Sequence, residues 1–424
     1  MKQHQDAHDR VVITGIGLIT SVGNDREGVW HAIQRGRSGV RGMTGIPGIP
    51  DGSLLGAQVR LGGPEPPELK NFPLCSRTVA EALTDAGIRP KADNRHRFGC
   101  SITGHMGDMS YIAGLNGRPD LFPPGAPWHT QWMPNSACAR VASEFGLHGP
   151  RMSNVTACAS STIGIISATR AIRDGLCDYA VAGGSEIINP LIAAGFSNMR
   201  VLAQHDDPEQ ACRPFDAGRT GFVMGEGAAM FVLERLDLAL ARGASIYAEV
   251  VAGGLLNDAR HVTSLEGDST ALVQLIQNIL RQGKLSPRDI DLVNAHGTGT
   301  QQNDAMESHG VRAALGRAAD RVNVTANKSM IGHLVSASGA VELAITALAM
   351  RDAFCPPTLN LTHPDPKCDL DCTPLVGRDR AIEHALKLSI AFGGHMAAIA
   401  LRRWQGPGER ESRREWRQPL PVAA

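Results

Sequence analysis

Residues 154–173 read NVTACASSTIGIISATRAIR, an apolar, β-prone approach that ends at Cys158 and passes directly into a helix of small residues. A second stretch, residues 327–351, reads NKSMIGHLVSASGAVELAITALAMR and repeats the plan: a short polar turn, then a small-residue helix. The two helices end in similar sequences, and each turn carries a reactive side chain, Cys158 or His333. This internal echo predicts two related halves that divide near residue 250.

Short apolar runs alternate with helical patterns along the rest of the chain. The runs are apolar throughout rather than at every second position, which is typical of strands covered on both faces. They lie at residues 11–15, 179–183, 227–233, 246–251 and 292–295. The alternation predicts a layered α/β fold in which residues 1–250 form one half, residues 251–405 the other, and residues 406–424 a flexible charged tail.

Composition excludes several classes of function. The 424 residues include 42 basic and 42 acidic side chains, whereas a general nucleic-acid binder would show a basic excess. No apolar run approaches the ~18 residues of a membrane span, and the polar N-terminus does not resemble a signal peptide. Nine scattered cysteines without a CxxC pair fit a reducing compartment. We therefore expect a cytoplasmic protein that binds neither membrane nor nucleic acid.

Two further segments carry expectations of their own. Gly15-Ile16-Gly17 follows the first apolar run, but Thr20 occupies the position where a dinucleotide-binding fingerprint needs its third glycine. We therefore expect a tight turn after the first strand rather than a cofactor loop. Residues 107–136 are rich in Gly, Pro and Trp and lack periodicity, which predicts a long functional or interface loop.

Cys158 is the first candidate for chemistry. A thiol at a helix N-terminus faces unpaired backbone N–H groups and the positive end of the helix dipole, and both favour the thiolate. The small neighbouring residues leave room for an acyl group. A buried structural cysteine is the alternative interpretation for this position, and we favour that interpretation for most of the other eight.

Two histidines stand in comparable settings. His296 lies in the run NAHGTGT, residues 294–300, directly after a buried strand, where the threonines could hydrogen-bond a polar ligand tail. Lys328 and His333 precede the second small-residue helix. Taken singly, each has an ordinary alternative: a satisfied turn histidine, a solvated lysine, a capping histidine. One cysteine and two histidines, each at a strand-to-helix turn, make a stronger constellation than any member alone.

Together these motifs resemble the elongating β-ketoacyl-acyl-carrier-protein synthases, the synthase I/II type of the thiolase superfamily. The resemblance runs from Val11 to about Arg403. It rests on VVITGIG, on TACASS around Cys158, on RPFD and GEG between residues 213 and 227, on HGTGT, on NKSMIGH, and on the Phe392 FGG run. It implies a thiolase-like fold of two similar halves stacked as five layers, αβαβα, and a dimer.

Carried over position by position, the resemblance implies a role for each of five side chains. Cys158 would accept the acyl group, and His296 and His333 would promote decarboxylation. Lys328 would be the supporting cation and Glu307 its carboxylate partner. Backbone N–H groups of Cys158 and Phe392 would form the oxyanion hole. The implied binding residues are Thr298 and Thr300 for phosphopantetheine, Phe392 as a gate, His105 and Met106 at the acyl pocket, and Arg200 and Arg213 for carrier docking.

The implied reaction is decarboxylative condensation of an acyl group with a malonyl-acyl-carrier protein, giving a 3-oxoacyl chain two carbons longer in fatty-acid synthesis. It needs no metal or redox cofactor, and the acyl carrier protein is the partner. Ile331, Ile390 and His395 depart from the family pattern, so a specialised type II polyketide or polyene ketosynthase, working as a homodimer or with a chain-length-factor subunit, stays open. A degradative thiolase would need a second cysteine near Gly394, and a non-catalytic chain-length subunit would lack Cys158.

Overall fold

The computed structural model describes residues 9–46, 48–62, 70–104, 133–265 and 267–406. Within these ranges, ten strands form one hydrogen-bonded sheet in the order β11-β10-β14-β15-β9-β1-β8-β6-β4-β5. The strands of the first half are β1 (Val11–Thr20), β4 (Phe98–Gly104), β5 (Arg151–Met152), β6 (Tyr179–Glu186) and β8 (Gly227–Arg235). Those of the second are β9 (Ala248–Asn257), β10 (Leu292–Asn294), β11 (Asn323–Thr325), β14 (His384–Ile390) and β15 (His395–Arg403).

The two halves of the sheet have the same topology. From the middle outward, each half places its own first, fifth, fourth, second and third strand in that order. In both halves the two inner pairings are antiparallel and the two outer pairings are parallel. The halves meet where β1 pairs with β9 over three residues, Val11–Ile13 against Ala248–Val250. The predicted duplication is therefore confirmed.

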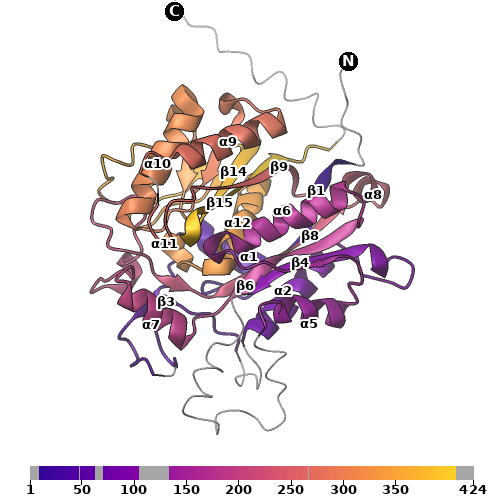
Figure 1. Cartoon of the computed structure of the whole chain (residues 1–424), viewed down its shortest axis with the longest axis horizontal. Coiled ribbons are helices and arrows are strands. Elements are labelled where there is room, and N and C mark those ends of the chain that lie inside the picture. The colour runs from indigo at the N-terminus through magenta and orange to yellow at the C-terminus, as the bar shows by residue number, and fades with distance from the viewer. Residues whose placement is uncertain (1–8, 47, 63–69, 105–132, 266, 407–424) are drawn as a thin grey trace, which may run out of the picture.

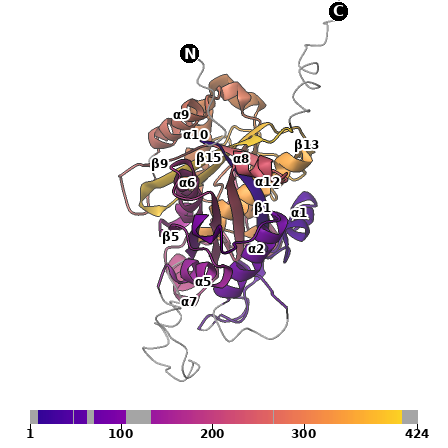
Figure 2. The ribbon, with the colours of Figure 1, turned by 90° about the vertical axis from the view of Figure 1, so that its right-hand side faces the viewer.

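Helices complete five layers, as the sequence predicted. Figures 1 and 2 show α6 (Ser160–Arg173) and α12 (Ser338–Asp352) between the two halves of the sheet. Helices α2 (Asn71–Asp85) and α5 (Ser136–Phe145) cover the outer face of the first half. Helices α9 (Thr270–Gly283) and α10 (Gln301–Leu315) lie on the opposite side of the molecule, over the second half.

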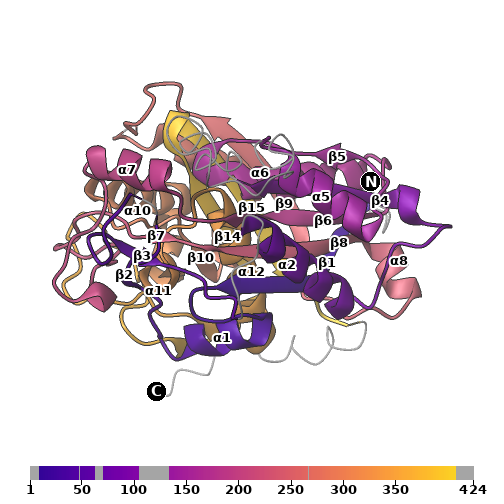
Figure 3. The same cartoon turned by 90° about the horizontal axis from the view of Figure 1, so that it is seen from below.

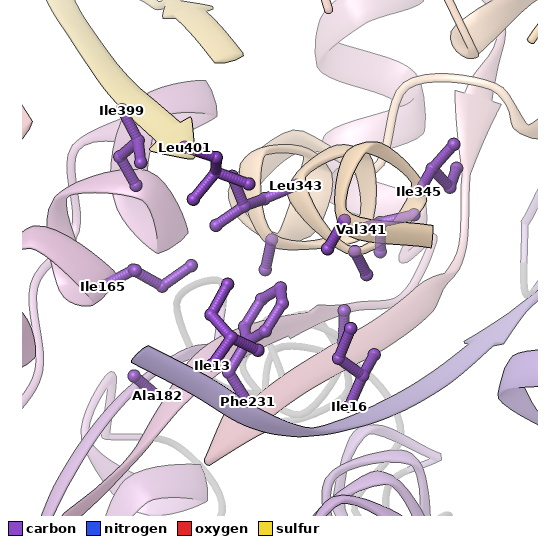
Figure 4. Close-up of a cluster of buried hydrophobic side chains, with 14 of the residues drawn as sticks. Ile13, Ile16, Ile165, Ala182, Phe231, Val341, Leu343, Ile345, Ile399 and Leu401 are labelled. Carbon is purple, nitrogen blue, oxygen red and sulfur yellow. The ribbon is translucent and has the colours of Figure 1, made fainter. Parts of the chain in front are cut away.

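The core explains why α12 is apolar on every side. Its residues from Ser338 to Met350 are all buried, as expected for a helix enclosed on all faces. Figure 4 shows Val341 and Leu343 of this helix close to Ile13, Phe231 and Leu401, which come from strands of both halves. Burying each such side chain contributes about 1.5–3 kcal/mol, so the central layer joins the two halves.

A smaller three-stranded sheet lies at one end of the molecule, beside α7 (Pro190–Asn198) (Figure 3). It consists of β2 (Arg41–Gly42), β3 (Leu55–Ala57) and β7 (Met224–Gly225). Met224 forms a β-bridge to His333, so this sheet supports one side of the candidate site. The other elements are α1 (Arg26–Gln34), α8 (Leu236–Ala241), α11 (Lys328–Ile331), β12 (Phe354–Cys355) and β13 (Arg378–Asp379).

Two local predictions, the division of the halves and the turn after the first strand, differ from the structure. The division predicted at residue 250 falls inside β9, and the segment between α8 and β9 separates the halves. The expected turn at Gly15-Ile16-Gly17 is wrong, because β1 continues to Thr20. A Cβ at either glycine would overlap a carbonyl oxygen of α2, so the glycines allow that helix to pack closely.

Several expectations fall on residues outside the described ranges. They concern His105, Met106, nearly all of the predicted loop 107–136, and the tail after residue 406. Of the helices within the described ranges, none combines the length and apolar character that a membrane crossing requires.

Candidate active site

The reactive turns of the two halves have matching backbones. Cys158 lies in the 3₁₀ turn Ala157–Ala159, which leads into α6, and the turn Val335–Ala337 leads into α12 in the same way. Ala157 has φ +46° and Val335 has φ +35°, although neither is a glycine. Such conformations cost about 1–3 kcal/mol and are typical of functional sites. The strain in the first half fixes Cys158 at the junction of turn and helix.

Cys158, His296 and His333 lie together, although long stretches of chain separate them. Cys158 Sγ is 3.1 Å from His333 Nε2. The two imidazole rings stand 5.3 Å apart between centroids, at 82° to each other. One polar atom from each of the three side chains lies within 4.8 Å of the others. A thiol and an imidazole at hydrogen-bond distance form the nucleophile–base arrangement used in covalent catalysis.

These side chains line a cavity of about 470 Å³. Its wall also includes the predicted binding residues Thr298, Thr300, Phe392 and Arg200. The hydroxyl groups of Thr298 and Thr300 are 2.9 Å apart, and Asp304 accepts hydrogen bonds from the backbone N–H groups of Thr298 and Gly299. The turn that carries both threonines is therefore held from behind by a buried carboxylate.

Lys328 fixes the orientation of His296. Its Nζ lies 3.3 Å from His296 Nδ1 and also donates a hydrogen bond to the His296 carbonyl oxygen. An ammonium has donors but no acceptor, so Nδ1 must be the acceptor and the ring proton sits on Nε2. His333 Nδ1 lies 2.8 Å from Ser338 Oγ, a hydroxyl that can donate or accept. His296 is thus fixed as an Nε2–H donor, and His333 can serve in either tautomer.

The implied pairing of Lys328 with Glu307 is wrong. Lys328 forms its ion pair with Glu342 of α12, at 2.5 Å. Glu307 instead accepts hydrogen bonds from the backbone N–H groups of His296, at 2.6 Å, and Gly297, at 2.8 Å. Helix α10 begins just after the turn that carries His296, so Glu307 in its second turn lies against the backbone of His296 and Gly297. Burial raises the pKa of Glu307 to about 7.

Burial sets the resting charges of the three reactive groups. It raises the pKa of the Cys158 thiol to about 12, against the opposing influence of the Lys328 ammonium. Burial and then the Lys328 charge hold the pKa of His296 and of His333 well below the usual histidine range. Burial thus opposes the thiolate that the position of Cys158 favours. The helix N-terminus favours the anion, but the loss of solvent outweighs it.

The two residues of the predicted oxyanion hole, Cys158 and Phe392, both line the cavity. Phe392 opens the turn Phe392–Gly394, in which Gly393 has φ +81°, and its side chain lines the cavity. Within the described ranges, neither Cys158 nor Phe392 donates its N–H group to a backbone carbonyl oxygen outside its own helix or strand. The neighbouring Gly393 N–H is bonded to the Val262 carbonyl oxygen, at 2.7 Å.

The two arginines expected to dock the carrier differ in setting. Arg200 is exposed and lies at the cavity wall. Arg213 is partly buried, with its Nε 3.8 Å from a carboxylate oxygen of Asp216. Of these two arginines, Arg200 is the one that is exposed at the cavity wall.

The sequence interpretation missed three residues of the site: Ser338, Glu342 and Lys387. Glu342 and Lys387 are buried and form an ion pair of 2.8 Å. A signal for both was present, since Glu342 is the one Asp, Glu, Lys or Arg in residues 338–350, and Lys387 is the one in residues 384–390. Charged residues are almost never fully buried unless they are paired.

Comparison with known proteins agrees with this geometry. Residues 72–239 match the Beta-ketoacyl synthase, N-terminal domain family, and residues 247–362 match the Beta-ketoacyl synthase, C-terminal domain family. The chain belongs to the β-ketoacyl synthase family. It is a condensing enzyme of the acyltransferase class, and its two family domains meet between α8 and β9, as the halves of the sheet do.

Individual relatives come from two kinds of pathway. A 3-oxoacyl-[acyl-carrier-protein] synthase 2 of Coxiella burnetii is 36% identical over 413 residues, which is 93% of this chain and 98% of the relative. A structure of a type II PKS acyl-carrier protein in complex with its ketosynthase bound to the hexaketide matches with TM-score 0.85 and 30% identity. The ishigamide ketosynthase/chain length factor matches with TM-score 0.84 and 29% identity. Both structural matches cover 93% of this chain and 99% of the other.

Proposed function

We propose that this β-ketoacyl synthase transfers an acyl chain from its carrier to Cys158 and condenses it with malonyl-acyl-carrier protein. The product is a 3-oxoacyl chain, two carbons longer, on the carrier. The observation that carries the proposal is the distance of 3.1 Å between Cys158 Sγ and His333 Nε2, in a cavity that also holds His296. No metal or redox cofactor is part of the proposal.

In the first half-reaction the Cys158 sulfur attacks the carbonyl carbon of the acyl thioester. Because burial keeps the resting sulfur protonated, its proton passes to His333 Nε2 as the C–S bond forms. The amides of Cys158 and Phe392 stabilise the developing oxyanion. When the tetrahedral intermediate collapses, the carrier thiol leaves with the proton from His333. The acyl-enzyme then holds a neutral imidazole.

In the second half-reaction the two imidazoles act as donors. The Nε2–H groups of His296 and His333 bind the thioester oxygen of the malonyl group, where enolate charge develops as carbon dioxide leaves. The enolate carbon attacks the acyl carbonyl carbon, and the bond to Cys158 sulfur breaks. The released thiolate takes up a proton from solvent, which replaces the one that left with the carrier thiol in the first half-reaction. Ser338 can support both tautomers of His333 that this sequence requires, because a hydroxyl donates or accepts.

Thr298 and Thr300 are proposed to bind the phosphopantetheine arm, and Arg200 to contact the acidic carrier. The enzyme is proposed to work as a dimer in the cytoplasm, where reducing conditions preserve the Cys158 thiol. All nine cysteines are free thiols in the structure. Fatty-acid elongation is the proposed pathway, in line with relatives such as the Coxiella burnetii synthase.

A specialised polyketide pathway is the second candidate. The similarity to a type II polyketide ketosynthase and to a ketosynthase/chain length factor favours it. So does Ile390, which lines the cavity at a position where the chain departs from the usual pattern of the elongating enzymes. In that case a homologous chain-length-factor subunit would replace the second copy of this chain.

One experiment tests the reaction and separates the pathways. The protein is incubated with a panel of acyl-carrier thioesters, saturated, unsaturated and 3-oxo, and acyl groups on Cys158 are detected by intact mass, with Cys158→Ala as the control. Saturated acyl groups support fatty-acid elongation, and 3-oxo or polyene groups support the polyketide pathway. Absence of any acyl group on Cys158 across the panel contradicts the proposed function. Native mass of the purified protein distinguishes a homodimer from a chain that needs a partner.

A further inference from the structure

A second buried lysine lies beneath the histidine pair. Lys387 is in β14, fully buried, and its ammonium forms an ion pair of 2.8 Å with Glu342 Oε2. Its Nζ also donates to the Leu388 carbonyl oxygen. The other carboxylate oxygen, Oε1, is paired with Lys328. Two lysine side chains thus share one carboxylate in a fully buried site. Burial lowers the pKa of Lys387 from its ordinary value, and the Glu342 carboxylate opposes that effect.

This arrangement is not one that stability alone favours. Burying a charge costs several kcal/mol, and only pairing with good geometry offsets the cost. Lys328 and Glu342 already balance each other, so Lys387 brings an additional charge into the core. Replacing such a group by an apolar residue is often neutral or stabilising. The presence of Lys387 therefore calls for a reason outside the stability of the fold.

The reason lies in the groups around Lys387. The titratable and charged side chains that face it come from α10, α11, α12 and the two histidine turns, namely Glu307, Lys328, Glu342, His296 and His333. The Lys387 charge acts on both imidazoles and lowers the pKa of each, in addition to burial and to Lys328. A nearby positive charge disfavours a protonated imidazole.

We infer that Lys387 is a positioning residue for the condensation: it holds Glu342 through Oε2 and adds a second positive charge, beside that of Lys328, behind the two histidine turns. A neutral His333 can accept the Cys158 proton, whereas an imidazolium cannot. Lys328 contacts His296 directly. Lys387 acts on the histidines indirectly, through its ion pair with Glu342 and through its charge. The inference rests on the proposed function, because it assigns Lys387 a task in that reaction.

Charge and hydrogen bonding are separated by substitution. Lys387→Gln keeps a donor towards Glu342 and removes the charge, Lys387→Met removes both, and Lys387→Arg keeps the charge. Lys91→Gln, at an exposed lysine, is the matched control. Each variant is first checked for folding by circular dichroism and thermal unfolding. Release of carbon dioxide from malonyl-acyl-carrier protein and acylation of Cys158 are then followed as functions of pH.

The expected result is a change in the acid limb of the pH profile, that is, in the range of low pH where kcat falls as the imidazoles become protonated. In Lys387→Gln the limb moves up by about one pH unit, so kcat falls about tenfold at acid pH and little at alkaline pH, with KM unchanged. Lys387→Met, which serves if Lys387→Gln does not fold, shows the same shift. Lys387→Arg and Lys91→Gln keep the wild-type limb.

Two results overturn the inference: an acid limb that stays at its wild-type position in the charge-free variants, or a limb that moves equally in Lys387→Arg. Either would leave Lys387 as a structural residue that affects stability only. Failure of the proposed function has a different signature, because then the wild-type protein itself neither acylates Cys158 nor releases carbon dioxide.

Discussion

The two halves of the molecule present the same backbone turn and use it for different purposes. In the second half the turn is closed by protein: Ser336 donates to Glu186 Oε2 from its backbone N–H, at 3.0 Å, and from its hydroxyl, at 2.8 Å. In the first half Cys158 stands at the equivalent place, and its side chain faces the cavity. In the second half, the buried carboxylate of Glu186 therefore binds the turn at the helix N-terminus. In the first half, the equivalent turn faces the cavity through Cys158.

This difference shows how a duplicated fold acquires an asymmetric site. Strand order, strand direction and positive φ are repeated in both halves, so the scaffold alone does not decide which turn reacts. The two turns differ in a few side chains: the first carries a thiol and the second a hydroxyl, and Glu186 accepts hydrogen bonds from Ser336 of the second turn. The second half contributes instead the residues just before its turn, Lys328 and His333. Each half thus supplies a different part of one site.

The largest expected effect comes from removing the thiol of the first turn. Cys158→Ala should lower condensation by roughly 10⁴-fold or more, because no acyl-enzyme can form. Carbon dioxide release from malonyl-acyl-carrier protein should persist, since His296 and His333 remain. Radiolabelled condensation and carbon dioxide release, measured on the same preparation, check both expectations. Elongation at a rate near that of the wild type would show that the first turn is not the nucleophilic one.

The next largest effect distinguishes the two histidines. His296→Ala and His333→Ala should each lower condensation by roughly 10²–10³-fold, the usual consequence of losing one oxyanion-type donor. Only His333→Ala should also slow acylation of Cys158, because His333 Nε2 is the group that contacts the sulfur. Stopped-flow acylation rates for the two variants provide the measurement. Equal acylation rates would remove His333 from the first half-reaction.

A smaller effect is expected in the second turn. Ser336→Ala removes the hydroxyl hydrogen bond to Glu186 and should lower the free energy of unfolding by about 1–3 kcal/mol, since it leaves a buried acceptor less satisfied. The rate of condensation should stay close to that of the wild type. Urea unfolding gives the first quantity and steady-state kinetics the second. A large loss of activity in a folded variant would mean that this turn, too, takes part in catalysis.

The repeated elements were predictable from sequence because each leaves a local pattern. Apolar runs, small-residue helices and the turns holding Cys158, His296 and His333 follow from short-range periodicity and spacing. What could not be predicted depends on distant partners. The sequence interpretation paired Lys328 with Glu307, whereas in the fold Lys328 is paired with Glu342 and Glu307 binds the His296 turn. The same limit applies to Gly15 and Gly17, whose role is set by the approach of α2.

The prediction for the charge of Cys158 has a related limit. Its place at a helix N-terminus is a local property that sequence reveals, and it favours the thiolate. The degree of burial is a global property that needs the whole fold, and it raises the pKa of the thiol to about 12. Sequence thus identified side chains that the structure brings together, whereas the effect of burial on their pKa values required the structure.

The smallest expected effect lies outside both turns, at the cavity entrance. Arg200 is exposed at the cavity wall, so Arg200→Glu should raise KM for the carrier-bound acyl substrate several-fold and leave kcat nearly unchanged. The difference from the wild type should shrink at high salt, because exposed charges are screened beyond about 10 Å at 0.1 M ionic strength. Arg213→Gln serves as the comparison, since Arg213 is already paired with Asp216 and its loss should leave KM for the carrier little changed. If Arg200→Glu leaves KM unchanged at low salt, or if a small acyl thioester without carrier shows the same rise, the contact with the carrier lies elsewhere on the surface.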